Sequence, residues 1–386
     1  MTNELDLGGP IPRGRILLEA SAGTGKTYAL TALIVRSLAD GLVDINEVLV
    51  VTFTRSAARE ILDRVRAGIE EAATALRGPA DNVPSWVLPL LDGDEHALSA
   101  RHDRLRAASI DLDAAVVTTI HGFCRHALRL LGSKSPLSHG STVSESASNA
   151  HAQTVRDLLI AALVDQPGAL DPAGGDTNPA RIEMAMAEVV KRVLQNRGAT
   201  VVPDPTWTAD DGLAGGALQW AELARRATAE VVRRRIASGE LDHDDLLTLL
   251  HEALHDVDSG PATARGLRSR FPMVFIDEFQ DTDTVQWEIF ERAFIAEPEK
   301  LGAASDLFVV GDPKQGIYRF RGADIEAYLA ASGGADTRYD LTVNHRSDGH
   351  LIDIFNELCR GATFGDARIR YIEVQQSADT PANTMG

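Results

Sequence analysis

A loop near the amino terminus contains residue types that hold phosphate groups. It consists of Ala20, Ser21, Ala22, Gly23, Thr24, Gly25, Lys26 and Thr27. In loops of this kind the backbone N–H groups and the start of the following helix point at the phosphates, a Lys neutralises the β- and γ-charge, and a Thr hydroxyl ligates Mg²⁺. The sequence therefore predicts a phosphate-binding loop, with Lys26 at the phosphates and Thr27 at the metal.

The loop departs at one position from the pattern G-x-x-x-x-G-K-[ST], because Ala20 stands where the first Gly is usual. Ala fits there if its φ is negative. Taken alone, the segment also fits an ordinary turn before a helix, and kinases, transporters and motors share such loops. A strand, a loop, a Lys-Thr pair and a helix arriving together favour nucleotide binding without naming the reaction.

Two adjacent carboxylates, Asp277 and Glu278, follow the apolar run 273–276. In a P-loop ATPase an acidic residue at the carboxyl end of a buried strand orders Mg²⁺, and a neighbouring Glu polarises the attacking water. Acidic residues also cap helices, but two carboxylates at the end of an apolar strand are costly to desolvate without a cation. We expect Asp277 at the metal and Glu278 at the water.

Three more side chains follow later apolar runs. Gln315 comes after the run 307–310, where it could sense the γ-phosphate, and Tyr318 offers a face for nucleobase stacking. Arg346 follows a predicted strand at 339–343 and could stabilise γ-phosphate charge in a transition state. Alone, Tyr318 would more simply be a core residue and Arg346 a surface residue.

These side chains require a sheet that brings strand ends together. Besides those already named, strands are expected at 48–51 and 114–118, a helix at 28–38, and a loop at 78–100, where Pro and Gly recur. Strands that alternate with helices predict a parallel sheet covered on both faces, an α/β fold.

The alternation stops between residues 126 and 240, where an Ala- and Leu-rich pattern predicts an all-helical insertion with its clearest helix at 217–237. The core is therefore expected to be discontinuous. The run Arg233–Arg235 closes that helix and by default is a solvated last turn, with a DNA-backbone contact as the alternative. Residues 375–386 read as a polar tail.

Composition limits the classes of protein to consider. The apolar content of 44% and the absence of any apolar run near 18 residues predict a cytoplasmic protein that does not contact membranes. The net charge is −18, and residues 241–386 hold 13 Lys and Arg against 26 Asp and Glu. A contact with DNA would therefore need a local groove and not the whole surface.

Five ordered motifs carry a resemblance to a known family. They read EASAGTGKT at 19–27, VVTFT at 50–54, TTIHGF at 118–123, DEFQDT at 277–282 and GDPKQ…IY.FRGA at 311–323. The sequence resembles the UvrD/Rep class of superfamily 1 DNA helicases, and within it the RecB-type helicases. The resemblance implies a RecA-like P-loop fold and an ATP- and Mg²⁺-dependent DNA helicase that moves 3′ to 5′ in double-strand-break repair and recombination.

The resemblance also implies roles for single residues. Glu278 would be the catalytic base, and Gln315 and Arg346 would contact the γ-phosphate. The single-stranded DNA groove would be lined by Thr52, Phe53, Thr119, His121 and Tyr318. Other implied partners are duplex-end DNA and RecC- and RecD-like subunits.

The same resemblance implies a division of the chain. Residues 1–125 and 241–345 would form the first motor domain, residues 126–240 its helical accessory insertion, and residues 346–386 the start of a truncated second motor domain or a tail. Departures from the family are the absence of Gln in residues 1–15 and His345 where Tyr or Trp is usual.

Two other functions remain open at this point. The chain would be expected to hydrolyse ATP weakly or not at all without the second motor domain, so the first alternative is a non-hydrolysing ATP- and single-stranded-DNA-binding module that acts through a partner. The second is a kinase-like transferase, which leaves the motifs at 277–282 and 311–315 without a role.

Overall fold

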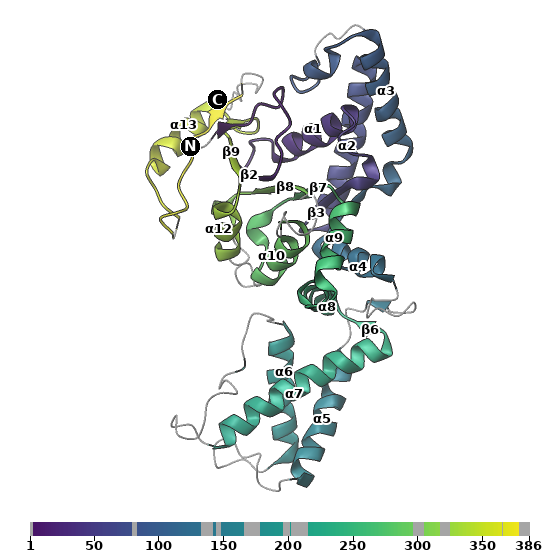
Figure 1. Cartoon of the computed structure of the whole chain (residues 1–386). Helices are drawn as coiled ribbons and strands as arrows, with labels where there is room; N and C mark the ends of the chain where they lie inside the picture. The colour runs from purple at the N-terminus through teal and green to yellow at the C-terminus, as the bar shows by residue number, and fades with distance from the viewer. Residues whose placement is uncertain are drawn as a thin grey trace. The chain divides into compact units, whose positions relative to one another are not determined.

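The described part of the chain forms a parallel sheet with helices, plus a separate helical unit. Figure 1 shows a computed structural model of the whole chain. The structure describes residues 3–78, 83–132, 142–143, 148–165, 178–195, 201, 215–295, 305–316, 325–364 and 366–377. Tyr318 lies outside these ranges. No described helix is both long and apolar enough to cross a membrane.

In the described ranges seven strands form the main sheet, and every neighbouring pair is parallel. Across the sheet they are β1 (Asn3–Glu4), β9 (Thr337–Leu341), β2 (Arg15–Ala20), β8 (Asp306–Gly311), β7 (Met273–Ile276), β3 (Val48–Thr52) and β4 (Val116–Thr119). Strands buried on both faces read as continuous apolar runs, which is why the sequence pattern located β2, β3, β7 and β8. It also predicted strands at the positions of β4 and β9, although most of their residues are only partly buried. The two-residue β1 carries no such run and was not predicted. The α/β fold and its discontinuous core are confirmed.

One face of the sheet packs against α1 (Lys26–Ala39), α2 (Arg55–Ala75) and α3 (Glu95–Ile110) (Figure 1). Alternate strand residues, among them Leu18, Val50 and Phe308, share one buried cluster with the apolar stripes of these helices. Phe275 and Phe308 stack within it with ring centroids 4.5 Å apart. The side chains of a strand alternate between faces, so the remaining strand residues point to the opposite face.

The expectation of a loop over 78–100 was wrong in its last part. The short 3₁₀ turn Leu88–Leu91 and the start of α3 at Glu95 fall within it. Asp94 caps α3 by accepting from the Ala97 backbone N–H at 2.8 Å. Only His102, Leu105 and Ala108 are buried along the helix, so its apolar stripe is too thin for a pattern of helical period to show in the sequence.

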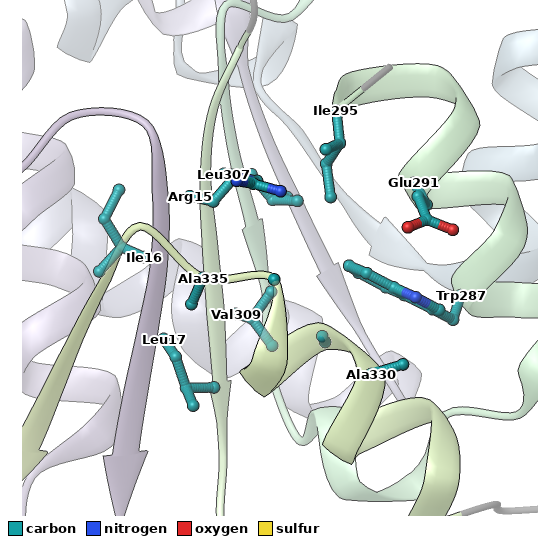
Figure 2. Close-up of a pocket in the computed structure, with 12 residues that line it drawn as sticks. Arg15, Ile16, Leu17, Trp287, Glu291, Ile295, Leu307, Val309, Ala330 and Ala335 are labelled. Atoms are coloured by element: carbon teal, nitrogen blue, oxygen red, sulfur yellow. The ribbon is translucent and has the colours of Figure 1, made fainter. Parts of the chain in front are cut away.

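The opposite face is covered by α9 (Gly260–Arg270), α10 (Thr284–Phe290), a π-helical turn (Glu291–Ile295) and α12 (Ile325–Gly333) (Figure 1). A cavity of about 30 Å³ lies there between Leu307 of the sheet and Trp287 and Ala330 of the helices, and Figure 2 shows Trp287 and Glu291 facing it. Arg15 and Leu307 stand at the amino ends of their strands, so this cavity lies away from the carboxyl ends where the motifs are.

The remaining elements are short or lie in other parts of the chain. They are α4 (Ile120–Leu130), α5 (Ser148–Asp165), α6 (Pro179–Gln195), α7 (Gly215–Ser238), α8 (His243–His255), α13 (Gly349–Cys359), the pair β5 (Thr142–Val143) and β6 (Glu240–Leu241), the pair β10 (Val343–Asn344) and β11 (Gln375–Gln376), and 3₁₀ turns at Ile45–Glu47, Leu112–Ala114, Phe279–Asp281 and Pro313–Gln315. The predicted strand at 339–343 is thus two strands in two sheets. The polar tail was placed too early, because Gln375 and Gln376 pair with β10.

The contacts divide the chain into two compact units. One holds residues 1–123 and 253–386, and the other holds residues 124–252. In the second unit α5, α6 and α7 bury a shared core that includes Val155, Met186 and Ala227. Helix α7 covers the predicted helix at 217–237.

Arg235 at the end of α7 corrects the expectation of a solvated turn, because its side chain is only 2% exposed. It forms ion pairs with Asp242 and with Asp245, the latter at 3.2 Å. The residues before it follow the default, since Arg233 pairs with Glu230 in an exposed contact.

Candidate functional site

The candidate residues meet at one edge of the main sheet. Because all the strands are parallel, their carboxyl ends lie together. The register pairs Ala20 with Leu341 and Glu19 with Gly311. It also pairs Val51 with Ile276 and Thr52 with Thr119. The motifs that follow these strands therefore line a single edge, although the first and the last of them, at Ala20 and Arg346, lie 326 positions apart in the sequence.

The phosphate-binding loop has the backbone that its residue types predict. Gly23 and Gly25 adopt φ of +83° and +84°, in the left-handed region that favours glycine. Ala20 ends β2, and Glu278 is the one non-glycine residue of positive φ in the described ranges, so Ala20 meets the condition that its φ is not positive. Gly25 is the N-cap of α1 and makes no side-chain capping bond. The first-turn N–H groups at Lys26 and Thr27 are thus placed to face an anion.

The Lys26 ammonium contacts the second motif directly. Its Nζ lies 3.2 Å from Glu278 Oε2. The same oxygen accepts a hydrogen bond from Gln280 Nε2 at 2.6 Å. Glu278 adopts a left-handed backbone with φ of +53°, which costs a non-glycine residue of order 1–3 kcal/mol. This strained turn aims the Glu278 carboxylate toward the loop.

Asp277 supplies an unpaired buried carboxylate beside that contact. Its side chain is 8% exposed, and Oδ1 is buried without a hydrogen-bond partner. Burial and then the neighbouring charge of Glu278 raise the pKa of Asp277 to about 6, although Lys26 acts in the opposite direction. The pKa of Asp281 is also raised to about 6, by burial and by Glu278.

A buried oxygen without a partner is unfavourable until a cation or donor meets it. Asp277 with Thr27 at the start of α1 is a hard-oxygen set of the kind that Mg²⁺ binds through one or two protein ligands and its own waters. The residues present therefore fit Mg²⁺.

The strand that leads to Arg346 holds the loop from its other side. Asn344 Nδ2 donates to the Ala22 carbonyl at 3.0 Å, and the His345 N–H donates to the Gly23 carbonyl at 2.8 Å. Asn344 Oδ1 accepts from the N–H groups of Arg346 and Ser347. Arg346 is thus beside the loop and exposed. The sequence analysis missed Asn344, and its signal was a polar residue next to the chosen Arg346 at a strand end.

Gln315 sits on the turn after β8. Its Nε2 donates to Asp312 Oδ2 at 2.7 Å. The Asp312 backbone N–H in turn donates to Gln280 Oε1 at 3.0 Å. Gln315 is therefore linked to Glu278 through Asp312 and Gln280. The sequence predicted no separate role for Asp312 or Gln280, although both lie within the motifs at 311–323 and 277–282.

Four of the five residues predicted to meet DNA stand further along the same edge, at or just after the ends of β3 and β4, and the fifth, Tyr318, lies outside the described residues. Thr52 is fully buried, and its hydroxyl donates to the Thr54 carbonyl at 2.9 Å. Phe53 follows it and is half-buried. Thr119 Oγ1 accepts from the Gly122 N–H at 3.3 Å, and His121 lies in the first turn of α4. Two of the four described candidates thus have hydroxyls that bond to their own turn.

Comparison with known proteins identifies the family to which this chain belongs. The profile of the UvrD/REP helicase N-terminal domain matches residues 9–335. The chain belongs to the UvrD/REP helicase family. It is 38% identical over 376 residues to the RecBCD enzyme subunit RecB of Mycolicibacterium smegmatis, an alignment that covers 96% of this chain and 32% of that relative. The RecB subunit of Escherichia coli is 30% identical over 455 residues, covering 90% of this chain and 38% of the relative.

The chain therefore spans about a third of the length of these relatives. The matched part contains the phosphate-binding loop, Asp277, Glu278 and Gln315, while Arg346 lies beyond the residues matched by the UvrD/REP profile.

Proposed function

We propose that this UvrD/REP family chain forms the ATP-binding part of a RecB-like, ATP-dependent DNA helicase that acts in double-strand-break repair and recombination, moving 3′ to 5′. The observation that carries the proposal is the contact between Lys26 and Glu278 with the unpaired Asp277 beside it. A cation for phosphate, a carboxylate for water and a carboxylate for metal then converge on one glycine-rich loop.

The geometry supports a proposed role for each of these groups. The backbone of residues 20–25 and the start of α1 bind the β- and γ-phosphates, and Lys26 neutralises their charge. Glu278, oriented by Gln280, accepts the proton of the attacking water. Asp277 and Thr27 would hold Mg²⁺, which would neutralise phosphate charge when bound.

Gln315 and Arg346 stand at the γ-phosphate end of this arrangement, where they would link nucleotide state to movement. Such groups act through positioning and charge, which supply most of the catalysis in phosphoryl transfer.

DNA is proposed to run along β3 and β4. Phe53 and His121 would stack or contact single-stranded DNA, with Thr52 and Thr119 fixing the turns beneath them and Tyr318 adding a stacking face. Val51 of β3 pairs with Ile276 of β7, so the proposed DNA-binding stretch lies beside the strand that leads to Asp277 and Glu278. RecC- and RecD-like subunits are the proposed protein partners.

We also propose the division already outlined, with residues 1–125 and 241–345 as the first motor domain and 126–240 as its helical insertion. Residues 346–386 would begin a second motor domain. Helix α13 supports this part, because Leu351, Ile354, Phe355 and Leu358 lie at helical spacing and are each at least 45% exposed. A continuous apolar stripe of this kind normally packs against further protein.

The test is steady-state ATP hydrolysis with and without single-stranded DNA, beside Lys26→Ala and Glu278→Gln. DNA-stimulated turnover that both substitutions abolish would support the proposal. Nucleotide binding without turnover, unchanged by Glu278→Gln, would instead favour a non-hydrolysing module. Phosphate transfer to a small acceptor would favour a kinase-like transferase.

A further inference from the structure

A buried charged cluster lies under the phosphate-binding loop, on the sheet face that α12 covers. Its centre is Glu19 of β2, which is 3% exposed. Glu19 Oε1 lies 3.5 Å from Lys314 Nζ. Glu19 Oε2 pairs with Arg338 of β9 and accepts from the Tyr328 hydroxyl of α12 at 3.4 Å. One carboxylate thus joins three elements that flank β2.

The position of Glu19 in its strand is unusual. Ile16 and Leu18 point into the core under α1 and α2, so Glu19 points to the other face with Leu17. A carboxylate in a buried strand is strongly disfavoured unless it is paired and hydrogen-bonded. Burial accordingly raises the pKa of Glu19, while Arg338 and Lys314 act to lower it. An apolar residue would satisfy packing alone, so the charge at Glu19 requires another explanation.

The cluster continues from Glu19 to the catalytic groups. Lys314 Nζ also lies 2.8 Å from Asp312 Oδ1, and Asp312 is 2% exposed. The other Asp312 oxygen holds Gln315, and the Asp312 N–H holds Gln280, whose amide donates to Glu278. An unbroken series of polar contacts therefore runs from Glu19 through Lys314, Asp312 and Gln280 to Glu278.

The close approach of Gln280 to β8 depends on a glycine. A Cβ built on Gly311 would lie 2.8 Å from Gln280 Oε1, so a side chain there would push the Gln280 amide out of this position. Gly311 is also the register partner of Glu19. At this one register position, β2 therefore carries the buried carboxylate of Glu19, and β8 carries the glycine that leaves room for the Gln280 side chain.

We propose that Glu19 is a positioning residue for ATP hydrolysis, which fixes the Asp312–Gln315 turn through Lys314 and thereby orients Gln315 and Glu278 at the γ-phosphate. The inference rests on the proposed function, since it assigns Glu19 a task at the same nucleotide site. Glu19 does not touch the phosphates. It acts on the groups that distinguish ATP from ADP.

The test compares the affinities of Mg-ADP and Mg-ATPγS for the chain, measured by calorimetry, so that it does not depend on turnover. We expect the native chain to bind Mg-ATPγS more tightly than Mg-ADP. In Glu19→Gln the affinity for Mg-ADP should stay within about twofold, while the preference for Mg-ATPγS should fall about tenfold or vanish. Loss of thermal stability alone, with the preference unchanged, would show that Glu19 is only structural and would overturn the proposal.

Two further variants keep the result interpretable. Glu19→Gln leaves Asp312 as the one carboxylate beside the buried Lys314 among the contacts described and could destabilise the chain. The double variant Glu19→Gln/Lys314→Gln removes one charge of each sign and keeps the charge balance. It should lose the same preference, and a native preference in this double variant would overturn the proposal. Asp336→Asn is the matched control, because Asp336 pairs with Arg15 in an exposed contact at the amino ends of the strands. It should leave the preference unchanged.

Results with the native chain separate this inference from the proposed function. If the native chain bound neither nucleotide, the proposed ATP site would fail. If it bound both with equal affinity, the site would stand, but there would be no γ-phosphate arrangement for Glu19 to position, and this inference would fail.

Discussion

The Lys26 ammonium lies 3.2 Å from the Glu278 carboxylate, and this contact joins the loop after β2 to the turn after β7. Strand β8 lies between those two strands in the sheet. The contact therefore reaches across a neighbouring strand at the carboxyl edge. It places the proposed phosphate cation and the proposed base within one hydrogen bond of each other, with the Gln280 amide on the same carboxylate oxygen.

Lys26→Met is expected to weaken Mg-ATP binding by at least about tenfold, which corresponds to about 1.4 kcal/mol. Met keeps most of the length and volume of the side chain but cannot neutralise phosphate charge. The affinity can be measured with a fluorescent ATP analogue at constant ionic strength, since salt screens such contacts.

Lys191→Met is the matched control, because Lys191 is an exposed residue on α6 of the other unit. It should bind the analogue as the native chain does. Equal affinity of Lys26→Met and the native chain would remove Lys26 from the nucleotide site.

Asp277 makes the stability depend on pH in a defined direction. Its pKa is raised from 3.8 to about 6, so the folded chain holds the proton more tightly than the unfolded chain. The free energy of unfolding should therefore fall as the pH rises from about 4 to about 6, and level off above that. A shift of this size corresponds to about 3 kcal/mol. Denaturant unfolding in metal-free buffer between pH 4.5 and 7.5 measures it.

Asp277→Asn should flatten this dependence only in part, because the pKa of Asp281 is also raised to about 6. Added Mg²⁺ should stabilise the native chain at pH 7.5 and much less at pH 4.5, since the ion needs the ionised carboxylate. An unchanged pH dependence in Asp277→Asn would show that its carboxyl is not the buried acid described here.

The sequence could locate those candidate site residues whose signal is local. The loop 20–27 and the pair Asp277–Glu278 each directly follow a buried strand, and a parallel sheet brings such strand ends together whatever the length of chain between them. The same logic placed Gln315 and Arg346 at this edge. At the ends of β3 and β4 the same reasoning located the backbone but could not predict the direction of each side chain. The burial of Thr52 was therefore not foreseen.

The rest depended on long-range packing. Glu19 reads as one polar letter in an apolar strand, and only the fold brings Lys314 and Arg338 to it from positions about 300 residues away. Arg235 differs in range, because its partners Asp242, just before α8, and Asp245, within α8, lie close in the sequence. Its local pattern nevertheless matches a solvated helix end. Charge pairs of this kind leave no periodic signal in the sequence.

Gly23→Ala tests the backbone of the phosphate-binding loop. Its φ of +83° disfavours any side chain by about 1–2 kcal/mol. The new Cβ would also lie 2.9 Å from Arg346 Cβ and from Asn344 Oδ1. We expect lower stability and weaker nucleotide binding, because the clash pushes the loop away from Asn344. Thermal unfolding with and without Mg-ATP measures both effects.

Gly266→Ala provides the comparison, since Gly266 lies within α9 and a Cβ there meets nothing within 4 Å. Alanine is the better helix former, so this variant should gain about 0.5–1 kcal/mol. If Gly23→Ala behaved like Gly266→Ala, the loop conformation described here would be wrong.

Arg235→Met is expected to destabilise the helical unit by about 3–5 kcal/mol, because it leaves Asp245, which is fully buried, without its cation. The exposed pair of Arg233 and Glu230 should contribute only about 0–1 kcal/mol, so Arg233→Met is the matched control. Hydrogen exchange of the amides in α7 and α8 locates the effect in residues 124–252.

The same two variants decide the alternative role of the run Arg233–Arg235 as a DNA contact. If Arg233→Met keeps its stability but binds single-stranded DNA more weakly than the native chain, with a shallower dependence on salt concentration, the run contacts the DNA backbone. If its DNA binding matches that of the native chain, Arg233 is a solvated residue and Arg235 is a structural one.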